Sequence, residues 1–292
     1  MTLIVGVKCS DGIVLGADSK ATYATPMGQS TISQDTVTKL HIANSRIVVG
    51  VSGPVGLGQS YSDEVDAYLA QNGQQVKWKS VAAAKTDLSQ RFWKHAEPCW
   101  QRAAATVGVT GQQAALMQCL HYSAVAFEID DEARLITFSQ QCAAEEVTRD
   151  LPFVAIGSGQ PQADPFLAFI RRIFWPSGLP TRTDGELACI WTLSEVIKHS
   201  PGGVGGAIQV VSFAKDKSRK WRAYELPKPE IDTHLQALTE MEMAMPSQLR
   251  ISTTPVQPPS PSDTIPQPSE PVSAETQSAA TTDEPARRTK PD

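Results

Sequence analysis

Thr2 has a residue type and a position that could support nucleophilic catalysis. Because a small second residue favours removal of the initiator methionine, we expect Met1 to be lost and Thr2 to begin the mature chain. An N-terminal threonine carries a hydroxyl that can attack a carbonyl carbon and an α-amine that can accept the hydroxyl proton. A threonine after methionine is also common in proteins without this chemistry. Thr2 is therefore a candidate nucleophile only if the neighbouring sequence supports that role.

A predicted β-hairpin would bring Asp18 close to Thr2. Apolar runs at residues 3–7 and 13–17 flank the turn residues Ser10-Asp11-Gly12, a pattern typical of two antiparallel strands. One strand leads away from Thr2 and the other returns, so Asp18 should end near the start of the first strand. An exposed aspartate at the end of a strand is the structural alternative.

The segments around these two residues resemble a known family. Residues 2–8 read TLIVGVK and residues 11–19 read DGIVLGADS, which is similar to the opening of proteasome β-subunits and of the bacterial HslV peptidase, both N-terminal nucleophile hydrolases. In that family the threonine is the nucleophile, and an aspartate sixteen residues later belongs to the catalytic site, as Asp18 follows Thr2 here. The similarity covers about residues 2–226 and looks closest to the stand-alone bacterial proteasome homologues.

The resemblance implies roles for Lys39 in the string KLHI, Gly53 in VSGPVG and Ser158 in AIGSG. The Lys39 ammonium would lie beside the nucleophile, where its charge favours deprotonation of nearby groups, and Asp18 would hold it in place. The Gly53 backbone N–H would bind the oxyanion of a tetrahedral intermediate, and Ser158 would hydrogen-bond at the threonine amine. A surface lysine and ordinary glycine turns are the structural alternatives, and the segment between residues 22 and 39 is longer than in typical members.

Two positions depart from the family pattern. In the turn after the last core helix, Ser200 stands where the family has an aspartate, and Gly203 stands where it has a serine. These two groups support the amine in typical members. Their replacement predicts weaker orientation of the amine and slower turnover.

The resemblance also implies a substrate pocket beside Thr2. None of its expected residues is acidic, and Val51 would form its floor. We therefore expect a preference for uncharged, apolar residues of medium to large size before the cleaved bond. The expected lining is Ala21, Thr22, Val37, His41, Val51 and Val55.

The order of predicted elements is strands, two helices, strands, two helices, strands. Two antiparallel sheets packed face to face between two helical layers would bury every apolar face, so we expect an α+β fold, a four-layer αββα sandwich of the N-terminal nucleophile hydrolase type. Pro98 should kink or end the second helix, and Thr183-Asp184 should cap the last core helix. The expected strands are 3–7, 13–17, 38–42, 46–52, 120–129, 135–139, 153–156, 207–213 and 221–226, and the expected helices are 56–72, 81–105, 163–174 and 184–199.

Composition and charge exclude several other classes of protein. A net charge of -5 without clustered lysine and arginine gives no support for nucleic-acid binding. No run approaches the ~20 apolar residues that span a bilayer. The cysteines form no CxxC pair and the histidines show no metal-ligand spacing, so we expect reduced thiols, no metal, no other cofactor and a cytoplasmic location.

The sequence predicts three parts: a peptidase domain over 1–226, a helical extension over 227–250, and a disordered tail over 251–292. The tail is rich in proline, serine and threonine and lacks aromatic residues, so it cannot bury enough apolar surface to fold.

The resulting hypothesis is a threonine endopeptidase that assembles with itself into stacked rings and cleaves peptides or unfolded proteins. An ATP-dependent unfoldase is a further partner implied by the family. A catalytically weak scaffold with the same fold and an amidase for small amides are the alternatives.

Overall fold

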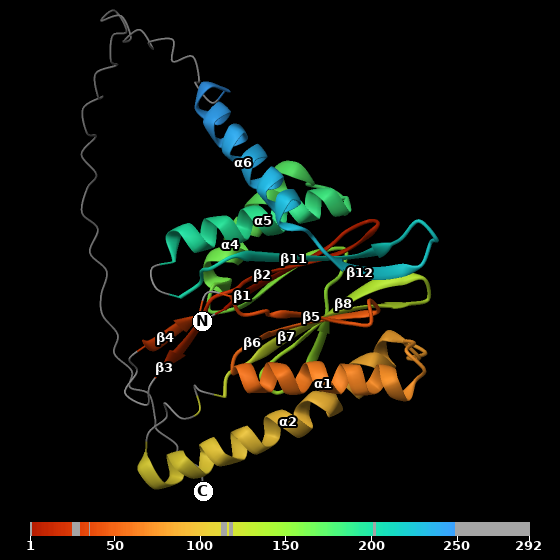
Figure 1. Cartoon of the computed structure of the whole chain (residues 1–292), viewed down its shortest axis with the longest axis vertical. Helices are drawn as coiled ribbons and strands as arrows, with labels where there is room; N and C mark the ends of the chain where they lie inside the picture. Colours follow the sequence, from red (N-terminus) through yellow and green to blue (C-terminus); the bar gives the residue numbers. More distant parts are fainter. Residues whose placement is uncertain are drawn as a thin grey trace, which may run out of the picture. The chain divides into compact units, whose positions relative to one another are not determined.

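Two five-stranded antiparallel sheets lie face to face between two pairs of helices (Figure 1). The computed structural model describes residues 2–24, 30–34, 36–111, 116, 119–200 and 203–248. The first sheet has the order β10 (Phe153–Gly157), β1 (Leu3–Lys8), β2 (Gly12–Asp18), β11 (Ile208–Lys215) and β12 (Trp221–Glu225). The second has the order β5 (Leu40–Ala43), β6 (Ile47–Ser52), β7 (Tyr122–Ile129), β8 (Glu132–Phe138) and β9 (Ala144–Glu146).

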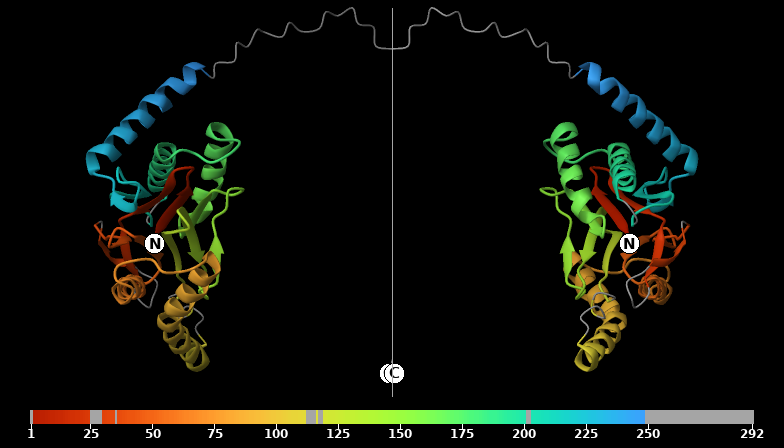
Figure 2. Two further views of the ribbon diagram at one scale, coloured as in Figure 1. Left: turned by 90° about the vertical axis from the view of Figure 1, so that its right-hand side faces the viewer. Right: turned by 90° about the vertical axis from the view of Figure 1, so that its left-hand side faces the viewer.

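Helices cover the outer face of each sheet (Figure 2). Helices α4 (Gln160–Phe174) and α5 (Arg182–His199) pack on the first sheet, and α1 (Val55–Gln71) and α2 (Val81–Thr110) pack on the second. A short separate pair is formed by β3 (Ala21–Ala24) and β4 (Ser30–Gln34), and α6 (Lys228–Gln248) follows the last strand. The predicted four-layer α+β sandwich is therefore confirmed.

Burial on both faces explains why β1 and β2 are nearly continuous apolar runs. Every residue of these two strands is buried. Side chains alternate across a strand, so Leu3, Val5 and Val7 pack toward the helices while Ile4 packs between the sheets. Each such buried aliphatic side chain contributes about 1.5–3 kcal/mol relative to an exposed one. The hairpin that carries Thr2 and Asp18 is thus held by the core on two sides.

Of the two outcomes expected at Pro98, a kink or the end of the helix, the structure excludes the second, and the predicted cap of α5 is wrong. Pro98 does not end α2, which runs on to Thr110. Phe92 and Ala96 before it and Ala103 after it are buried, and this packing offsets the roughly 3 kcal/mol that proline costs inside a helix. The cap of α5 is Thr181 rather than Thr183.

The capping box of α5 explains this choice. The Thr181 hydroxyl accepts a hydrogen bond from the Asp184 backbone N–H, and the Asp184 carboxylate accepts one from the Thr181 backbone N–H. A box of this kind needs its two members three residues apart, and only Thr181 stands at that distance from Asp184.

The C-terminal part of the chain is described only up to α6. Ile231 and Leu238 of this helix are buried with the residues between the first sheet and its helices, and the Trp191 indole N–H donates to Glu242 at 3.2 Å. The predicted tail at 251–292 lies outside the described residues, and the division into three parts stays a prediction. Within the described chain, none of the helices has the length and apolarity to cross a membrane.

Candidate active site

The hairpin of β1 and β2 brings Asp18 to Thr2. Ile4 pairs with Ala17, so the two residues lie at the same end of the hairpin. The Leu3 backbone N–H donates a hydrogen bond to Asp18 Oδ1 at 2.8 Å. Asp18 is completely buried and Thr2 is 8% exposed. The proximity expected from the strand–turn–strand pattern is present.

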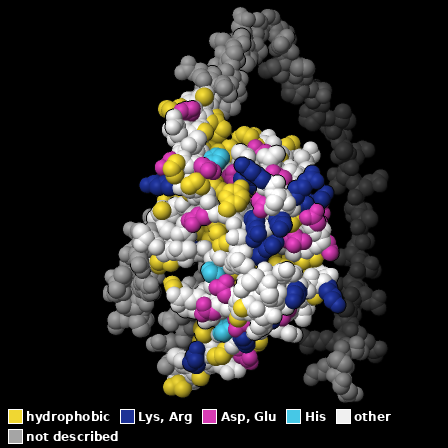
Figure 3. All heavy atoms as spheres, turned by 45° about the vertical axis from the view of Figure 1, so that its right-hand side comes forward, with side chains coloured by type: hydrophobic (Ala, Val, Ile, Leu, Met, Phe, Trp, Pro, Cys, Tyr) yellow, Lys and Arg dark blue, Asp and Glu magenta, His cyan; other side chains and the backbone are white. Residues whose placement is uncertain are grey.

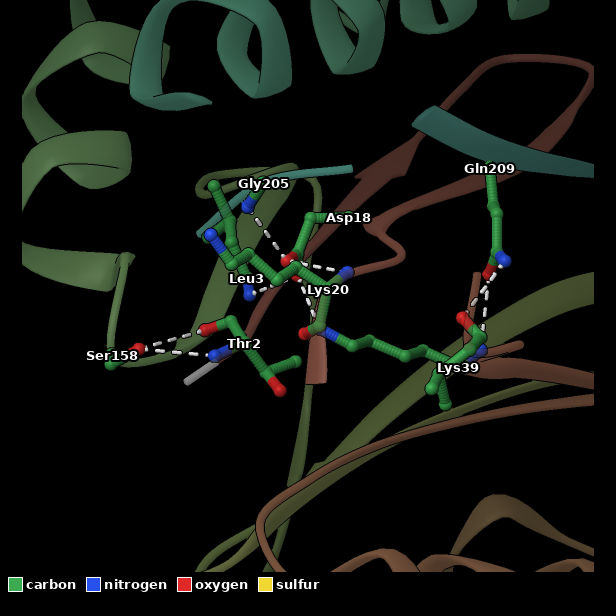
Figure 4. A network of polar contacts seen from close by, with 9 residues as sticks. Thr2, Leu3, Asp18, Lys20, Lys39, Ser158, Gly205 and Gln209 are labelled. Atoms are coloured by element: carbon green, nitrogen blue, oxygen red, sulfur yellow. Dashed lines mark hydrogen bonds and ion pairs between the residues drawn. The ribbon is translucent and has the colours of Figure 1, made fainter. Parts of the chain in front are cut away.

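Asp18 is the centre of a buried network of polar contacts (Figure 4). Lys39 Nζ lies 2.7 Å from Asp18 Oδ1 and also donates to the Lys20 carbonyl oxygen at 2.7 Å. The other carboxylate oxygen, Oδ2, accepts from the backbone N–H groups of Gly205 and Lys20 at 3.1 and 3.3 Å. A buried carboxylate needs such partners, because an unpaired charge in a low-dielectric interior is costly.

Burial lowers the pKa of Lys39, while the ion pair and hydrogen bond with Asp18 act in the opposite direction. The Lys39 side chain is only 6% exposed. Its position therefore depends on Asp18, which keeps the ammonium charged against the desolvation penalty.

Gln209 of β11 fixes the backbone that carries Lys39. Its side-chain oxygen accepts from the Lys39 backbone N–H at 3.0 Å, and its side-chain NH2 donates to the Val37 carbonyl oxygen at 3.0 Å. Sequence reasoning missed Gln209, Gly205 and the Lys20 carbonyl. No spacing in the sequence signals them, because two act through backbone atoms and Gln209 lies 170 residues from Lys39.

Ser158 holds the Thr2 backbone. The Thr2 nitrogen donates to Ser158 Oγ at 3.1 Å, and Ser158 Oγ donates to the Thr2 carbonyl oxygen at 3.3 Å (Figure 4). Gly157 beside it has a φ of 102°, and a Cβ atom there would lie 2.2 Å from the Thr2 carbonyl oxygen. Only glycine fits this position, which explains the glycine before Ser158.

Gly53 follows β6 on the other side of the site. Its φ is 133°, and a Cβ atom would lie 2.7 Å from the Leu120 carbonyl oxygen and 2.8 Å from His121 Cβ. His121 is buried: its Nδ1–H donates to the Cys119 carbonyl, and its Nε2 accepts from the Tyr61 hydroxyl at 2.8 Å. Burial lowers the pKa of His121, which favours the neutral form of the ring.

A pocket with a cavity volume of about 990 Å³ opens beside Thr2. Its lining contains Lys39, Gly53 and Ser158 together with five expected pocket residues, which are Ala21, Val37, His41, Val51 and Val55. Thr22 lies in β3, and its side chain is outside the part of the chain that the structure describes. The expectation that no acidic residue lines the pocket is wrong, because Asp63 of α1 is part of the wall.

Ser200 does not hydrogen-bond to Thr2, although it stands where the family pattern has an aspartate that supports the amine. It is the C-cap of α5, and its hydroxyl donates to Gln162 Oε1 of α4 at 2.9 Å. Gly203 is buried and has no side chain to offer. The same segment instead contributes the backbone N–H of Gly205 to Asp18.

Within the described ranges, no three His, Cys, Asp or Glu side chains come close enough together to hold a metal ion.

The four-layer fold and the N-terminal third of the chain are both similar to those of known proteins of the proteasome type. Residues 2–98 match the family model for proteasome subunits. Proteasome subunit beta 2 of Pyrococcus abyssi is 32% identical over 91 residues, a segment that spans 30% of this chain and 42% of that protein. The chain thus matches less than half of the length of this relative.

Solved structures of Anbu, the ancestral β-subunit, share the fold over most of their length. Anbu from Yersinia bercovieri aligns with a TM-score of 0.59 at 18% identity, covering 85% of this chain and 97% of that one. A Gly-1 mutant of Anbu from Hyphomicrobium sp. strain MC1 aligns with a TM-score of 0.60 at 16% identity, covering 85% and 98%. The helical assembly of the Anbu complex from Pseudomonas aeruginosa gives 0.59 at 18% identity, covering 85% and 96%.

These findings confirm the resemblance to the proteasome β-subunit superfamily that the sequence predicts. The match to the family model covers the first third of the chain, and the similarity in fold covers 85% of it.

Proposed function

We propose that this chain is a threonine-type endopeptidase subunit in which Thr2, freed by removal of Met1, is the nucleophile. The observation that carries the proposal is the placement of Thr2 on the wall of a large pocket. Its nitrogen is held by Ser158, and the buried pair of Asp18 and Lys39 lies directly behind it.

In the proposed reaction, Thr2 Oγ attacks the carbonyl carbon of the scissile peptide bond. The hydroxyl proton passes to the α-amine of Thr2, and the Gly53 backbone N–H stabilises the negative oxygen of the tetrahedral intermediate. The C–N bond then breaks, and the leaving amine takes the proton. Water hydrolyses the resulting ester and restores the threonine.

The charge of Lys39 is the proposed electrostatic aid to this step. A buried ammonium next to the nucleophile stabilises developing negative charge more strongly than one in water. Asp18 and the Lys20 carbonyl orient it, and Gln209 positions its backbone.

We further propose a homo-oligomeric ring, with stacked rings enclosing the sites. The family resemblance supports the ring, and the helical assembly of the Anbu complex from Pseudomonas aeruginosa supports self-association of this fold more generally. Such a chamber admits peptides and unfolded chains, so an ATP-dependent unfoldase is the partner class it would need for folded substrates. Native mass spectrometry of the purified protein tests the ring.

Intact mass spectrometry after treatment with a peptide epoxyketone tests the nucleophile. This reagent reacts with both the hydroxyl and the amine of an N-terminal threonine, so the proposal expects loss of Met1 and one adduct per chain. Thr2→Ala should also lose Met1 but remain unlabelled. Peptide cleavage by protein that retains Met1 would contradict the mechanism.

A catalytically weak scaffold is the second candidate, and one observation favours it. Ser200 replaces an aspartate of the family pattern, and its hydroxyl contacts Gln162 rather than Thr2. A protein that forms rings but neither cleaves a peptide library nor reacts with the epoxyketone would be this scaffold. Cleavage of small amides without peptide cleavage would indicate the amidase.

A further inference from the structure

One face of α1 forms a long wall of the pocket. Val55, Gly58, Gln59, Ser62 and Asp63 all line it. Their spacing is i, i+3, i+4, i+7 and i+8, which places them on one face of a helix. From Val55 to Asp63 the helix rises about 12 Å. Along this distance the wall changes from apolar to polar and then to acidic.

The acidic end of this wall has little positive charge to balance it. Asp63 is exposed and makes no ion pair with any described residue. Asp66, three residues further on, is also exposed and lies 2.9 Å from Nε2 of His41, a residue of the pocket lining. Figure 3 shows acidic and histidine side chains at the surface of the described part of the molecule.

Basic residues of the neighbouring helix α2 form ion pairs with a different carboxylate, that of Glu64. Glu64, on the side of α1 that faces α2, forms ion pairs with Arg91, Lys94 and His95. These cations are therefore turned away from the pocket. Helix α1 thus separates one well-compensated acid on its inner side from under-compensated acids on the pocket side.

The end of the pocket at Thr2 carries no comparable net charge. Among the described lining residues, Lys39 is the only lysine or arginine, and it is paired with the buried Asp18. The lining also includes the apolar side chains of Val51 and Val55, and Val55 begins the α1 wall close in sequence to Ser52 and Gly53. A side chain that enters from Thr2 therefore meets a neutral apolar section first and a negative section further along.

We infer that this pocket selects arginine or lysine before the cleaved bond, and that Asp63 is the specificity-determining residue. The inference rests on the proposed peptidase function. The methylene stem of a long basic side chain can pack against Val51 and Val55 while its cationic head reaches Asp63. An acidic side chain is repelled at the same point, and a leucine gains only the apolar section.

Three peptide epoxyketones that differ only in the residue next to the reactive group test this inference. They end in arginine, in citrulline and in leucine; citrulline has the shape of arginine without its charge. The rate of adduct formation at Thr2 is measured by intact mass, so the test works even where turnover is slow. We expect arginine to react about fivefold faster than citrulline, the size of one partly exposed ion pair.

Asp63→Asn should remove most of the difference between arginine and citrulline, and it should change the leucine rate much less than the arginine rate. Asp232→Asn is the matched control, because Asp232 is an exposed aspartate on α6, away from the pocket lining. Equal rates for arginine and citrulline in the unaltered protein overturn the inference and leave the proposed function standing. Absence of any adduct with all three reagents overturns the proposed function, and the inference with it.

Discussion

The carboxylates at the two ends of the pocket differ in burial and in their hydrogen-bond and ion-pair partners. Asp18, next to Thr2, is completely buried and accepts hydrogen bonds from Lys39 and from backbone N–H groups of Leu3, Lys20 and Gly205. Asp63, at the far end, is exposed and has no ion-pair partner in the described chain.

This contrast separates two uses of a negative charge. A buried carboxylate with all its partners inside the protein fixes geometry, because moving it would leave charges unpaired in a low dielectric. An exposed carboxylate without a partner is free to bind a ligand, and its contribution is small and sensitive to salt. Substitutions near Thr2 should therefore abolish peptide cleavage. Substitutions near Asp63 should instead alter which residue is preferred before the cleaved bond.

Lys39→Ala should give the largest effect. It leaves the Asp18 carboxylate buried without its counter-charge, so we expect loss of peptide cleavage and a fall in the free energy of unfolding of about 3 kcal/mol. Fluorogenic peptide assays and chemical denaturation measure the two effects. Lys20→Ala is the control, because Lys20 contributes backbone atoms to the network and should retain activity. Substantial cleavage by Lys39→Ala would show that Lys39 is not the catalytic lysine.

Gly157→Ala should also disable the Thr2 end. The added Cβ would lie 2.2 Å from the Thr2 carbonyl oxygen at a φ of 102°, so the strand carrying Thr2 must shift. We expect loss of epoxyketone labelling and a destabilisation of about 1–3 kcal/mol. Gly56→Ala is the matched control, since no atom lies within 4 Å of its Cβ position and φ is not positive. Normal labelling of Gly157→Ala would mean that Thr2 is not held as described.

The pH dependence of cleavage should reveal the charge of Lys39. Burial lowers its pKa, so its proton is lost before ordinary lysine side chains titrate. As the pH rises through this lowered pKa, the ion pair with Asp18 disappears and kcat/KM should fall. On the acid side, kcat/KM should rise with pH as the Thr2 amine becomes neutral. A plateau that persists up to the pKa of an ordinary lysine would contradict a role for the Lys39 charge.

Ser200→Ala should have the smallest effect. The hydrogen bond that it removes joins Ser200 to Gln162 near the surface and touches neither end of the pocket. We expect a loss of about 0.5–1 kcal/mol of stability at most, and cleavage rates within about twofold of the unaltered protein. A tenfold loss of cleavage would show that Ser200 supports the amine after all.

The fold could be predicted from the sequence because its signals are local. Apolar runs, the turn at Ser10-Asp11-Gly12 and helical spacing define the elements, and covering each apolar face leaves few architectures. The predicted end of α2 was wrong because tertiary packing overrides the local cost of Pro98. The predicted cap of α5 was wrong because the reciprocal contact with Asp184 was not recognised.

The candidate site could be predicted only in part. The proximity of Asp18 to Thr2 followed from the hairpin, whereas the site role of Asp18 and the choice of Lys39, Gly53 and Ser158 came from the family resemblance. Gln209 could not be found, because its contacts depend on which strands become neighbours in the sheet. Asp63 was missed for a different reason: a helix was expected at 56–72 without any of its residues being assigned to the pocket, although helical spacing from Val55 leads to Asp63.

The position of β1 has a consequence for synthesis on the ribosome. This strand is synthesised before β2 and β10, with which it pairs, and β2 pairs in turn with β11. At about 5–20 residues per second, the β11 segment leaves the ribosome on the order of ten seconds or more after β1. Until then Asp18 lacks the hydrogen bond from the Gly205 backbone N–H, and the Lys39 backbone N–H lacks its acceptor on Gln209. Thr2, the proposed nucleophile, would therefore pass through translation without the completed network around Asp18, and the site would be finished only when β11 joins the sheet.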